Sequence, residues 1–278
     1  MTPGEARRPP TVASGPVAKV LVGAALLAAA VPVLPSTTAV ASADDGLDTL
    51  RAVAPADGPD CHPPFDPAQP QWVIGYGSLM QETSRKRTAP NAAFAVPVEV
   101  SGYRRGWFAA GQMPGFNTVY LGVAPDPGTR LNAVIFDVPA GEIPALDARE
   151  YIYCRVAVPA ANTRILSGPG LSGSGDVAVG QAWIYVNKAD SLSLPSDRVP
   201  IVQSYVDEFL SGCLDLGDAN TLPDFARDCI ALTTDWSQHW VNDRIYPRRP
   251  HVYQPAAKRI DTLIAAELPR EFAAIRIE

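Results

Sequence analysis

The segment Val-Ile-Gly-Tyr-Gly-Ser-Leu-Met at residues 73–80 constrains the fold more than any other part of the chain. An apolar run ends at Gly75 and Gly77 and a polar stretch follows, as where a buried strand enters a tight turn. Ser78 and Gln81 have the spacing of a capping box, so we expect Ser78 to cap the helix that follows. Glycines let successive backbone N–H groups face one point, and the turn is therefore predicted to form a small anion-binding cradle.

Residues 1–43 have the features of a secretory signal peptide. Basic residues precede an apolar run at residues 20–34, and small residues lead to a predicted cleavage site after Ala43. The run is interrupted by proline and is too short to cross a hydrocarbon layer of ~30 Å. We therefore predict an exported protein, secreted or periplasmic, that has no membrane contact after cleavage.

The charge of the chain argues against nucleic acid as a partner. Its net charge is −6, and removal of residues 1–43, which carry three basic residues and one acidic residue, makes it more negative still. Binding to a phosphate backbone requires clustered Lys and Arg. Two basic clusters, at residues 85–87 and 248–249, are expected to be solvated surface.

Four cysteines follow the predicted signal peptide, at positions 61, 154, 213 and 229. Export makes disulfides the default state, and four cysteines allow three pairings. We favour Cys213 with Cys229, which closes a short loop, and by elimination Cys61 with Cys154, which would join the N-terminal arm to the core. No two cysteines have the spacing of a zinc site.

The hydrophobic pattern divides the rest of the chain into three parts. Residues 44–70 are rich in proline and aspartate, lack periodicity and are predicted to form an arm. Residues 71–190 form a strand-rich core, and residues 191–278 form a helical extension packed on that core. The fold class is therefore α+β. Strands are expected at residues 72–74, 96–100, 118–123, 131–138, 152–158 and 177–186.

Turns and helices are predicted between and after these strands. The sequence Pro-Asp-Pro-Gly at residues 125–128 is expected to end a strand, and the glycine-rich loop at residues 167–175 is a candidate lid. Trp236, His239 and Trp240 fit one face of a helix. Helices are expected from residue 79 to before residue 90, and at 143–150, 202–210, 224–232 and 258–268.

A second chemical cluster, at residues 147–156, contains two acids, an arginine and tyrosines at a helix-to-strand junction. A carboxylate walled by aromatic side chains can have its pKa raised, which suits it to accept a proton and return it. Glu150 is the candidate acid/base, and Asp147 is expected to cap or pair locally. The alternative is an ordinary charged helix end in which Glu150 pairs with an arginine.

The two clusters together resemble the γ-glutamylcyclotransferase-like superfamily. The sequence Gly-Tyr-Gly-Ser-Leu at residues 75–79 is followed by Leu-Asp-x-Arg-Glu-x-x-Tyr-x-Arg-Val at residues 146–156. The segments at residues 102–107 and 118–123 also match what the family carries between its motifs, and the resemblance covers residues 72–186. It implies a small, distorted β-barrel with flanking helices and a cavity at one mouth.

The resemblance also implies roles for named residues. Glu150 is the general acid/base, and the substrate is a small γ-glutamyl amine or peptide. The α-amine of the substrate attacks its own γ-carbonyl, which closes 5-oxoproline and releases an amine, amino acid or peptide, with no cofactor and no metal. The residues expected to bind the γ-glutamyl group or line the site are Tyr76, Gly77, Ser78, Leu79 and Tyr153.

Two positions depart from the family pattern, because Tyr151 and the pair at residues 132–133 stand where many members have glycine. A bulkier pocket edge affects the choice of substrate more than catalysis. Ser78 lacks the nucleophile-elbow pattern of serine hydrolases, and the three histidines are scattered. The alternative to an enzyme is a non-catalytic binding domain for small acidic or γ-glutamyl ligands. Export motivates it, because cytosolic γ-glutamyl pools are not obviously available outside the cell.

Overall fold

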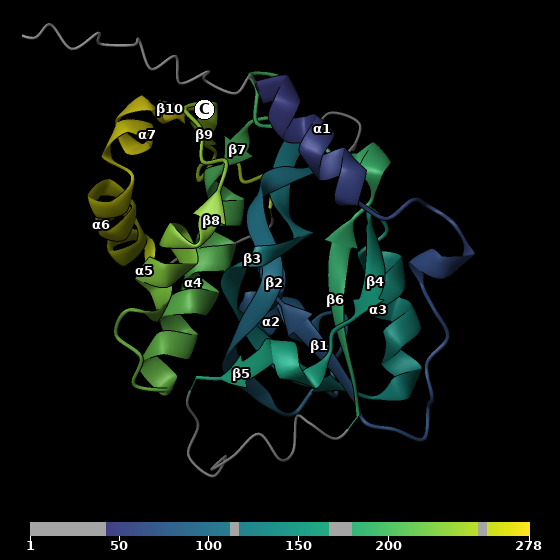
Figure 1. Cartoon of the computed structure of the whole chain (residues 1–278). Helices are drawn as coiled ribbons and strands as arrows, with labels where there is room; N and C mark the ends of the chain where they lie inside the picture. Colours follow the sequence, from purple (N-terminus) through teal and green to yellow (C-terminus); the bar gives the residue numbers. More distant parts are fainter. Residues whose placement is uncertain (1–42, 112–116, 167–179, 250–254) are drawn as a thin grey trace, which may run out of the picture. The chain divides into compact units, whose positions relative to one another are not determined.

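A mixed β-sheet of seven strands forms the centre of the computed structural model, which describes residues 43–111, 117–166, 180–249 and 255–278 (Figure 1). The predicted signal peptide, except for Ala43, lies outside the described residues, and so does the glycine-rich loop at residues 167–175. In the part of the chain that is described, no helix has both the length and the hydropathy to span a bilayer.

Strand β1 occupies the middle of the sheet, antiparallel to β3 and parallel to β6. All five of its residues are buried, which agrees with the uninterrupted apolar run in the sequence. The strand order is β4-β6-β1-β3-β2-β5, and β8 pairs with β2. The strands are β1 (Gln71–Gly75), β2 (Ala95–Gly111), β3 (Thr118–Val138), β4 (Tyr153–Ala157), β5 (Thr163–Ile165), β6 (Gln181–Asn187) and β8 (Thr233–Thr234).

The predicted α+β class is confirmed, while the closed barrel stays a prediction. The strand pairs recorded among the described residues run in an open order from β4 to β5.

The turn at residues 125–128 does not end a strand, contrary to the prediction. Strand β3 pairs with β2 on both sides of it, with Ser101 opposite Arg130 and Tyr103 opposite Pro125. Residues 126–129 therefore bulge out opposite a single residue, Gly102, whose φ of 86° is the left-handed conformation that glycine tolerates. Asp126 Oδ1 accepts the N–H of Gly128 at 3.3 Å within this bulge, but the paired flanks keep the strand continuous.

Helices cover the sheet from two sides. Figure 1 shows α4 beside β2 and β3, α6 on the far side of α4 and α5, and α3 beside β4. The predicted helices after residue 200 are confirmed, and the short second sheet lies among them. The helices are α1 (Ala43–Val53), α2 (Glu82–Lys86), α3 (Ile143–Arg149), α4 (Gln203–Ala219), α5 (Phe225–Ala231), α6 (Ala257–Glu267) and α7 (Pro269–Ala274). The second sheet contains β7 (Ile201–Val202), β9 (Trp240–Asn242) and β10 (Arg276–Ile277).

The segment predicted as an irregular arm begins with helix α1. Leu47, Leu50 and Ala54 lie on one face of this segment and pack against Phe108 and Leu192. The sequence pattern does not indicate this helix, because its apolar face is short. The helix is stabilised by the surface on which it packs rather than by its own helix propensity.

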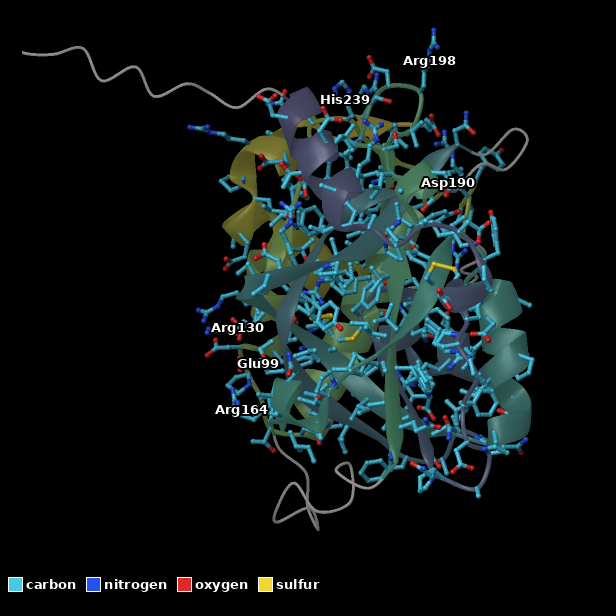
Figure 2. All side chains as sticks on the ribbon, turned by 45° about the vertical axis from the view of Figure 1, so that its right-hand side comes forward. Glu99, Arg130, Arg164, Asp190, Arg198 and His239 are labelled. Carbon is cyan, nitrogen blue, oxygen red and sulfur yellow. A yellow bond between two sulfur atoms is a disulfide. The ribbon has the colours of Figure 1, made fainter. Side chains whose placement is uncertain are left out.

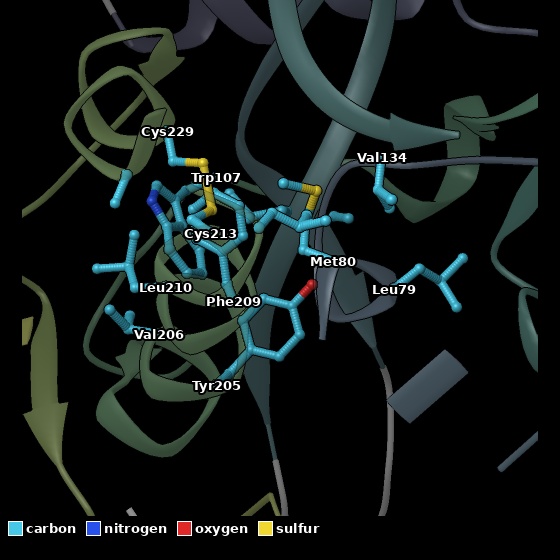
Figure 3. Packing of buried hydrophobic residues seen from close by; sticks show 14 of the residues in the cluster. Leu79, Met80, Trp107, Val134, Tyr205, Val206, Phe209, Leu210, Cys213 and Cys229 are labelled. Atoms are coloured by element: carbon cyan, nitrogen blue, oxygen red, sulfur yellow. A yellow bond between two sulfur atoms is a disulfide. The ribbon is translucent and has the colours of Figure 1, made fainter. Parts of the chain in front are cut away.

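Both predicted disulfides are confirmed. Cys61 is bonded to Cys154 and therefore fixes the arm to β4, and Cys213 joins α4 to Cys229 of α5 (Figure 3). In the chain-entropy model each crosslink stabilises the fold by about 3–5 kcal/mol.

Helix α4 packs directly on the turn that follows β1. Gly212 allows this approach, because a Cβ at that position would lie 2.4 Å from the backbone carbon of Met80. Met80 belongs to the same buried cluster as Trp107, Tyr205 and Phe209 (Figure 3). The turn is therefore held against a rigid, disulfide-bonded helix.

Trp236 and Trp240 are not on a helix, contrary to the prediction. Trp240 begins β9, and the two rings stack with centroids 5.3 Å apart. Trp236 also contacts Trp107 of the core, at 5.1 Å between centroids. Both rings therefore pack on the core without a helix.

Candidate active site

The turn after β1 places two glycines where side chains cannot fit. A Cβ on Gly75 would lie 2.6 Å from Cβ of Leu79, and one on Gly77 would lie 2.7 Å from the hydroxyl oxygen of Tyr205. The chain then makes one turn of 3-10 helix, η2 (Ser78–Met80), whose first hydrogen bond runs from Met80 N–H to Gly77 O at 2.9 Å. The N–H groups of Ser78 and Leu79 precede this bond, so they are outside the hydrogen bonds of the turn.

Ser78 does not cap a helix, contrary to the prediction. Because the 3-10 turn intervenes, α2 begins only at Glu82, and Gln81 caps it by accepting the N–H of Ser84 at 2.6 Å. The hydroxyl of Ser78 accepts a hydrogen bond from Arg149 at 3.0 Å instead.

Two buried arginines hold the carbonyl groups of this turn. Arg105 donates to Tyr76 O at 3.3 Å, and Arg85 donates to Leu79 O at 2.9 Å and to Met80 O. Burial lowers the pKa of Arg105 to about 9, so the side chain keeps its charge at neutral pH. Arg85 belongs to a cluster predicted to be surface, and that prediction is wrong for this residue because the turn carbonyls and the ring of Phe136 surround it.

Glu150 follows the last residue of α3, where its N–H donates to Leu146 O at 2.9 Å. Its side chain is 15% exposed and lies 3.2 Å from Nε of Arg149. Burial raises the pKa of the Glu150 carboxyl, while the positive charges of Arg149 and Arg249 oppose the rise. The Glu150 carboxylate is thus paired with an arginine, as expected for an ordinary charged helix end. It is also desolvated, as an acid/base requires.

Arg149 connects the two sequence motifs. It forms an ion pair with Glu150, and its terminal nitrogens donate to Ser78 Oγ at 3.0 Å, to Ser84 O at 2.7 Å and Oγ at 2.9 Å, and to Thr88 Oγ1 at 3.1 Å. Both terminal nitrogens of its guanidinium therefore donate two hydrogen bonds each. Arg149 fixes the acid relative to the glycine turn.

The predicted site residues line one cavity. A small inner space of about 20 Å³ is lined by Ile74, Tyr76, Gly77, Ser78, Leu79, Leu121, Glu150, Tyr153, Tyr185 and Tyr205. An outer cavity of about 200 Å³ shares Ser78, Glu150, Tyr153 and Tyr205 with it and adds Tyr120, Arg149, Tyr151, Ile152 and Arg249. Glu150 therefore lies where the inner and outer spaces meet.

A larger cavity, of about 530 Å³, lies elsewhere. Arg198 is one of the residues that line it. Figure 2 labels Arg198, with His239 in the same part of the view. None of the predicted site residues lines this cavity, and several of its charged side chains pair with one another, such as Arg276 with Asp197 and Arg248 with Glu278. The chemistry therefore points to the smaller cavity at Glu150.

The tyrosines in the site are fixed hydrogen-bond donors. Tyr76 donates its hydroxyl to Tyr185 O, and Tyr153 donates to Leu121 O at 2.9 Å. Burial raises the pKa of both hydroxyls well above the ordinary value, so both remain protonated.

Asp147 pairs locally, as predicted. It accepts hydrogen bonds from Nε of Arg155 at 3.0 Å and from the hydroxyl of Tyr185 at 2.7 Å. His62 lies 4.0 Å from Asp147, and His239 contacts Asp197 at 3.1 Å, so neither residue lines the two spaces at Glu150. His251 lies outside the described residues. Among the described residues, no three His, Cys, Asp or Glu side chains form a group that would hold a metal.

Sequence analysis missed the residues that the C-terminal segment brings to the site. Tyr205 comes from α4, where the helical spacing indicated only an apolar face. Arg249 belongs to a basic pair predicted to be solvated, yet its side chain is 26% exposed and contacts the buried Glu208 at 3.1 Å. Asn132, which departs from the family pattern, lies under the site, where Oδ1 accepts a hydrogen bond from Arg105 at 2.9 Å.

The burial of Glu150 predicts a pH-dependent stability. Its pKa in the folded protein is raised above the ordinary 4.5, so the folded state binds this proton more tightly than the unfolded chain does. This stabilisation is fully present below the unfolded pKa and is lost as the pH rises through the folded pKa. Glu150→Gln has no such proton, so the variant should gain stability relative to the wild type between about pH 4 and about pH 7.

Urea unfolding of both proteins at the two pH values measures this effect. The free energy of unfolding of Glu150→Gln minus that of the wild type should be larger at the higher pH. An unchanged difference would show that Glu150 titrates as an ordinary exposed carboxylate.

Comparisons with known proteins give structural matches only. No protein-family model matches the sequence, and no curated protein matches it. One solved structure that is similar is a γ-glutamyl cyclotransferase, with 13% identity, a TM-score of 0.44, and coverage of 71% of this chain and 99% of that one. A γ-glutamyl cyclotransferase specific to glutathione from yeast has 13% identity, a TM-score of 0.37, and coverage of 72% and 97%. YkqA from Bacillus subtilis has 14% identity, a TM-score of 0.39, and coverage of 59% and 56%.

These matches include the family that the two sequence motifs resemble. At such low identities and TM-scores they say nothing about the activity of this chain. The site geometry therefore has to support any function.

Proposed function

We propose that this chain is an exported enzyme of the γ-glutamylcyclotransferase type. It would convert a γ-glutamyl group to 5-oxoproline and release the attached amine, amino acid or peptide. The observation that supports this most is the joint lining of one cavity by Glu150 and the turn at residues 76–79, with Arg149 bonded to both sides. The two disulfides fit export, and the proposal includes the small barrel that the family resemblance implies.

Glu150 is proposed to act first as a base and then as an acid. The α-ammonium of the substrate, with a pKa of about 8, must lose a proton before its nitrogen can attack the γ-carbonyl carbon. Attack forms the ring C–N bond, and the bond from that carbon to the leaving nitrogen then breaks. The α-nitrogen loses two protons in all, one before attack and one after the ring bond forms. Both pass through Glu150 to the leaving nitrogen, which departs as an ammonium group, so no other reactant is needed. Burial raises the pKa of Glu150, which makes its carboxylate a stronger base toward the protons of the substrate.

The turn is proposed to position the substrate and stabilise negative charge. The N–H groups of Ser78 and Leu79 are suited to bind either the α-carboxylate or the oxyanion that forms on the γ-carbonyl. Arg105 and Arg85 fix the carbonyl ends of this turn, which limits how its N–H groups can reorient. Because ring closure is intramolecular, holding the substrate in a reactive conformation supplies much of the rate.

Incubation of the mature protein with γ-glutamyl amines, amino acids and peptides tests the proposal. Mass spectrometry of the products should detect 5-oxoproline and the released amine in equal amounts. Binding without product from any member of the panel would favour the alternative, a non-catalytic domain for γ-glutamyl or small acidic ligands.

A further inference from the structure

The outer cavity contains an aromatic side chain that the proposed reaction does not use. Four of the described residues that line this cavity are tyrosines, namely Tyr120, Tyr151, Tyr153 and Tyr205. The rings of Tyr120 and Tyr205 pack edge to face with centroids 5.0 Å apart, and Tyr153 donates its hydroxyl to Leu121 O at 2.9 Å. Tyr151 differs, because it is 54% exposed and no hydrogen bond, ion pair or ring contact joins it to another described residue.

The backbone on both sides of Tyr151 is fixed. The N–H of Tyr153 donates to Glu150 O at 2.9 Å, which closes a turn that contains Tyr151. Within the same turn, Ile152 O accepts the hydroxyl of Ser191 at 2.8 Å. The turn therefore holds Tyr151 directly beside the proposed acid/base, while its side chain remains exposed.

The side chain of Tyr151 lies on the outer side of Glu150. Glu150 lines both spaces of the site, whereas Tyr151 lines only the outer one. Tyr120 lines the outer space as well, and burial raises the pKa of its hydroxyl, with a further rise from the hydroxyl of Tyr151. An effect of this kind requires the two hydroxyl groups to be near each other. Tyr151 and Tyr120 thus border the same space.

The sizes of the two spaces decide which part of a substrate meets Tyr151. The inner space, of about 20 Å³, is about what a single water molecule requires, so no leaving amine fits there. The proposed reaction breaks the bond from the γ-carbonyl carbon to the leaving nitrogen beside Glu150. The leaving group must therefore extend outward from Glu150 into the space of about 200 Å³ that Tyr151 borders.

We propose that Tyr151 determines specificity by packing against an aromatic ring on the leaving group of the substrate. This inference rests on the proposed function. A ring beside Tyr151 covers apolar surface that is otherwise exposed, and two aromatic rings attract each other in edge-to-face and offset geometries that a saturated ring cannot adopt. Tyrosine has few rotatable bonds, so the contact costs little conformational entropy. The preferred leaving group is an amine or amino acid that bears an aromatic ring.

Three substrates test the inference. γ-Glutamylphenylalanine carries an aromatic ring, γ-glutamylcyclohexylalanine carries a saturated ring of nearly the same size, and γ-glutamylalanine carries no ring. Burial alone would favour the saturated ring, which is the more apolar of the two. The wild type should instead prefer phenylalanine over cyclohexylalanine by about 2- to 10-fold in kcat/KM, the range expected for an aromatic pair. It should prefer phenylalanine over alanine by about 10- to 100-fold.

Substitutions of Tyr151 separate the contributions of its ring and its hydroxyl. Tyr151→Phe keeps the ring and should keep both preferences. Tyr151→Leu keeps an apolar side chain and should lose the preference for phenylalanine over cyclohexylalanine. Tyr151→Ala should lose most of both preferences through a higher KM for γ-glutamylphenylalanine, because a contact made equally in the ground state and the transition state changes KM and not kcat.

Tyr246→Ala is the matched control, because Tyr246 is 83% exposed and lines neither space. It should keep the wild-type preferences. Equal losses for all three substrates in Tyr151→Ala, or no preference of the wild type for phenylalanine over cyclohexylalanine, would overturn the inference. If none of the substrates yields 5-oxoproline, the proposed function fails instead. Calorimetric binding of the same compounds to the wild type and to Tyr151→Ala then decides the role of Tyr151 by the same ratios, and binding without a preference for phenylalanine overturns it.

Discussion

Glu150→Gln should abolish formation of 5-oxoproline while leaving the binding of a γ-glutamyl compound intact. Glutamine has nearly the same size as glutamate but accepts no proton at neutral pH. A positioned acid/base contributes about 10²- to 10⁴-fold to a rate, and kcat should fall by that factor. Single-turnover assays and calorimetric titration measure the two parts of this prediction separately.

Asp147→Asn provides the matched control. It removes a carboxylate three positions away on the same helix, and Asp147 lines neither space of the site. Its partners Arg155 and Tyr185 keep it away from the substrate, so kcat should remain close to that of the wild type. Turnover retained by Glu150→Gln would eliminate Glu150 as the acid/base, and equal losses in both variants would indicate a general loss of structure.

The elements of this fold were largely predictable from local patterns. The run before Gly75 is apolar without interruption because β1 is buried on both faces, and the helical spacing after residue 200 reflects the packing of α4. Patterns of this kind depend on neighbours in the sequence. They failed at α1 and at the turn of residues 125–128, where contacts with distant segments decide the backbone.

The candidate site was predictable to the extent that it is built from local motifs. The turn and Glu150 carry recognisable residues, and the structure brings them to one cavity. Tyr205 and Arg249 carried no such signal, because their place in the site depends on tertiary contacts. The burial of Arg249 depends on Glu208, which lies 41 positions away in the sequence. No local pattern distinguishes such an arginine from a solvated one.

Replacement of Arg105 is expected to have the largest effect on stability. The side chain is fully buried, and its hydrogen-bond acceptors among the described residues are neutral, including the backbone oxygens of Asn132 and Cys229 at 2.8 Å each. Arg105→Met fills a similar volume but removes the recorded donor to the buried oxygens Asn132 Oδ1 and Tyr76 O. Each buried group left unsatisfied costs about 1–3 kcal/mol, so the free energy of unfolding should fall by about 3–5 kcal/mol.

The same substitution should also make the backbone of the turn at residues 76–79 more mobile. Arg105 donates to the carbonyl of Tyr76, and in a trans peptide the N–H of Gly77 points the opposite way from that carbonyl. Loss of the donor frees this peptide to rotate, so kcat should fall even under conditions where Arg105→Met is fully folded. Arg105→Lys keeps the charge but has fewer donors. Its free energy of unfolding and its kcat should therefore lie between those of the wild type and those of Arg105→Met.

Urea unfolding and 5-oxoproline assays on the same preparations separate these effects. Arg104→Met is the matched control, because Arg104 is the next residue on β2 and its guanidinium lies 5.6 Å from the ring of Phe108. A contact of that kind contributes about 0.5–1 kcal/mol, so the control should change stability little and turnover not at all. Wild-type stability in Arg105→Met would show that the buried hydrogen bonds of Arg105 do not support the fold. A loss of stability with unchanged kcat would show that the turn keeps its geometry without this arginine, because the contacts of Arg85 and α4 are then sufficient to orient its N–H groups.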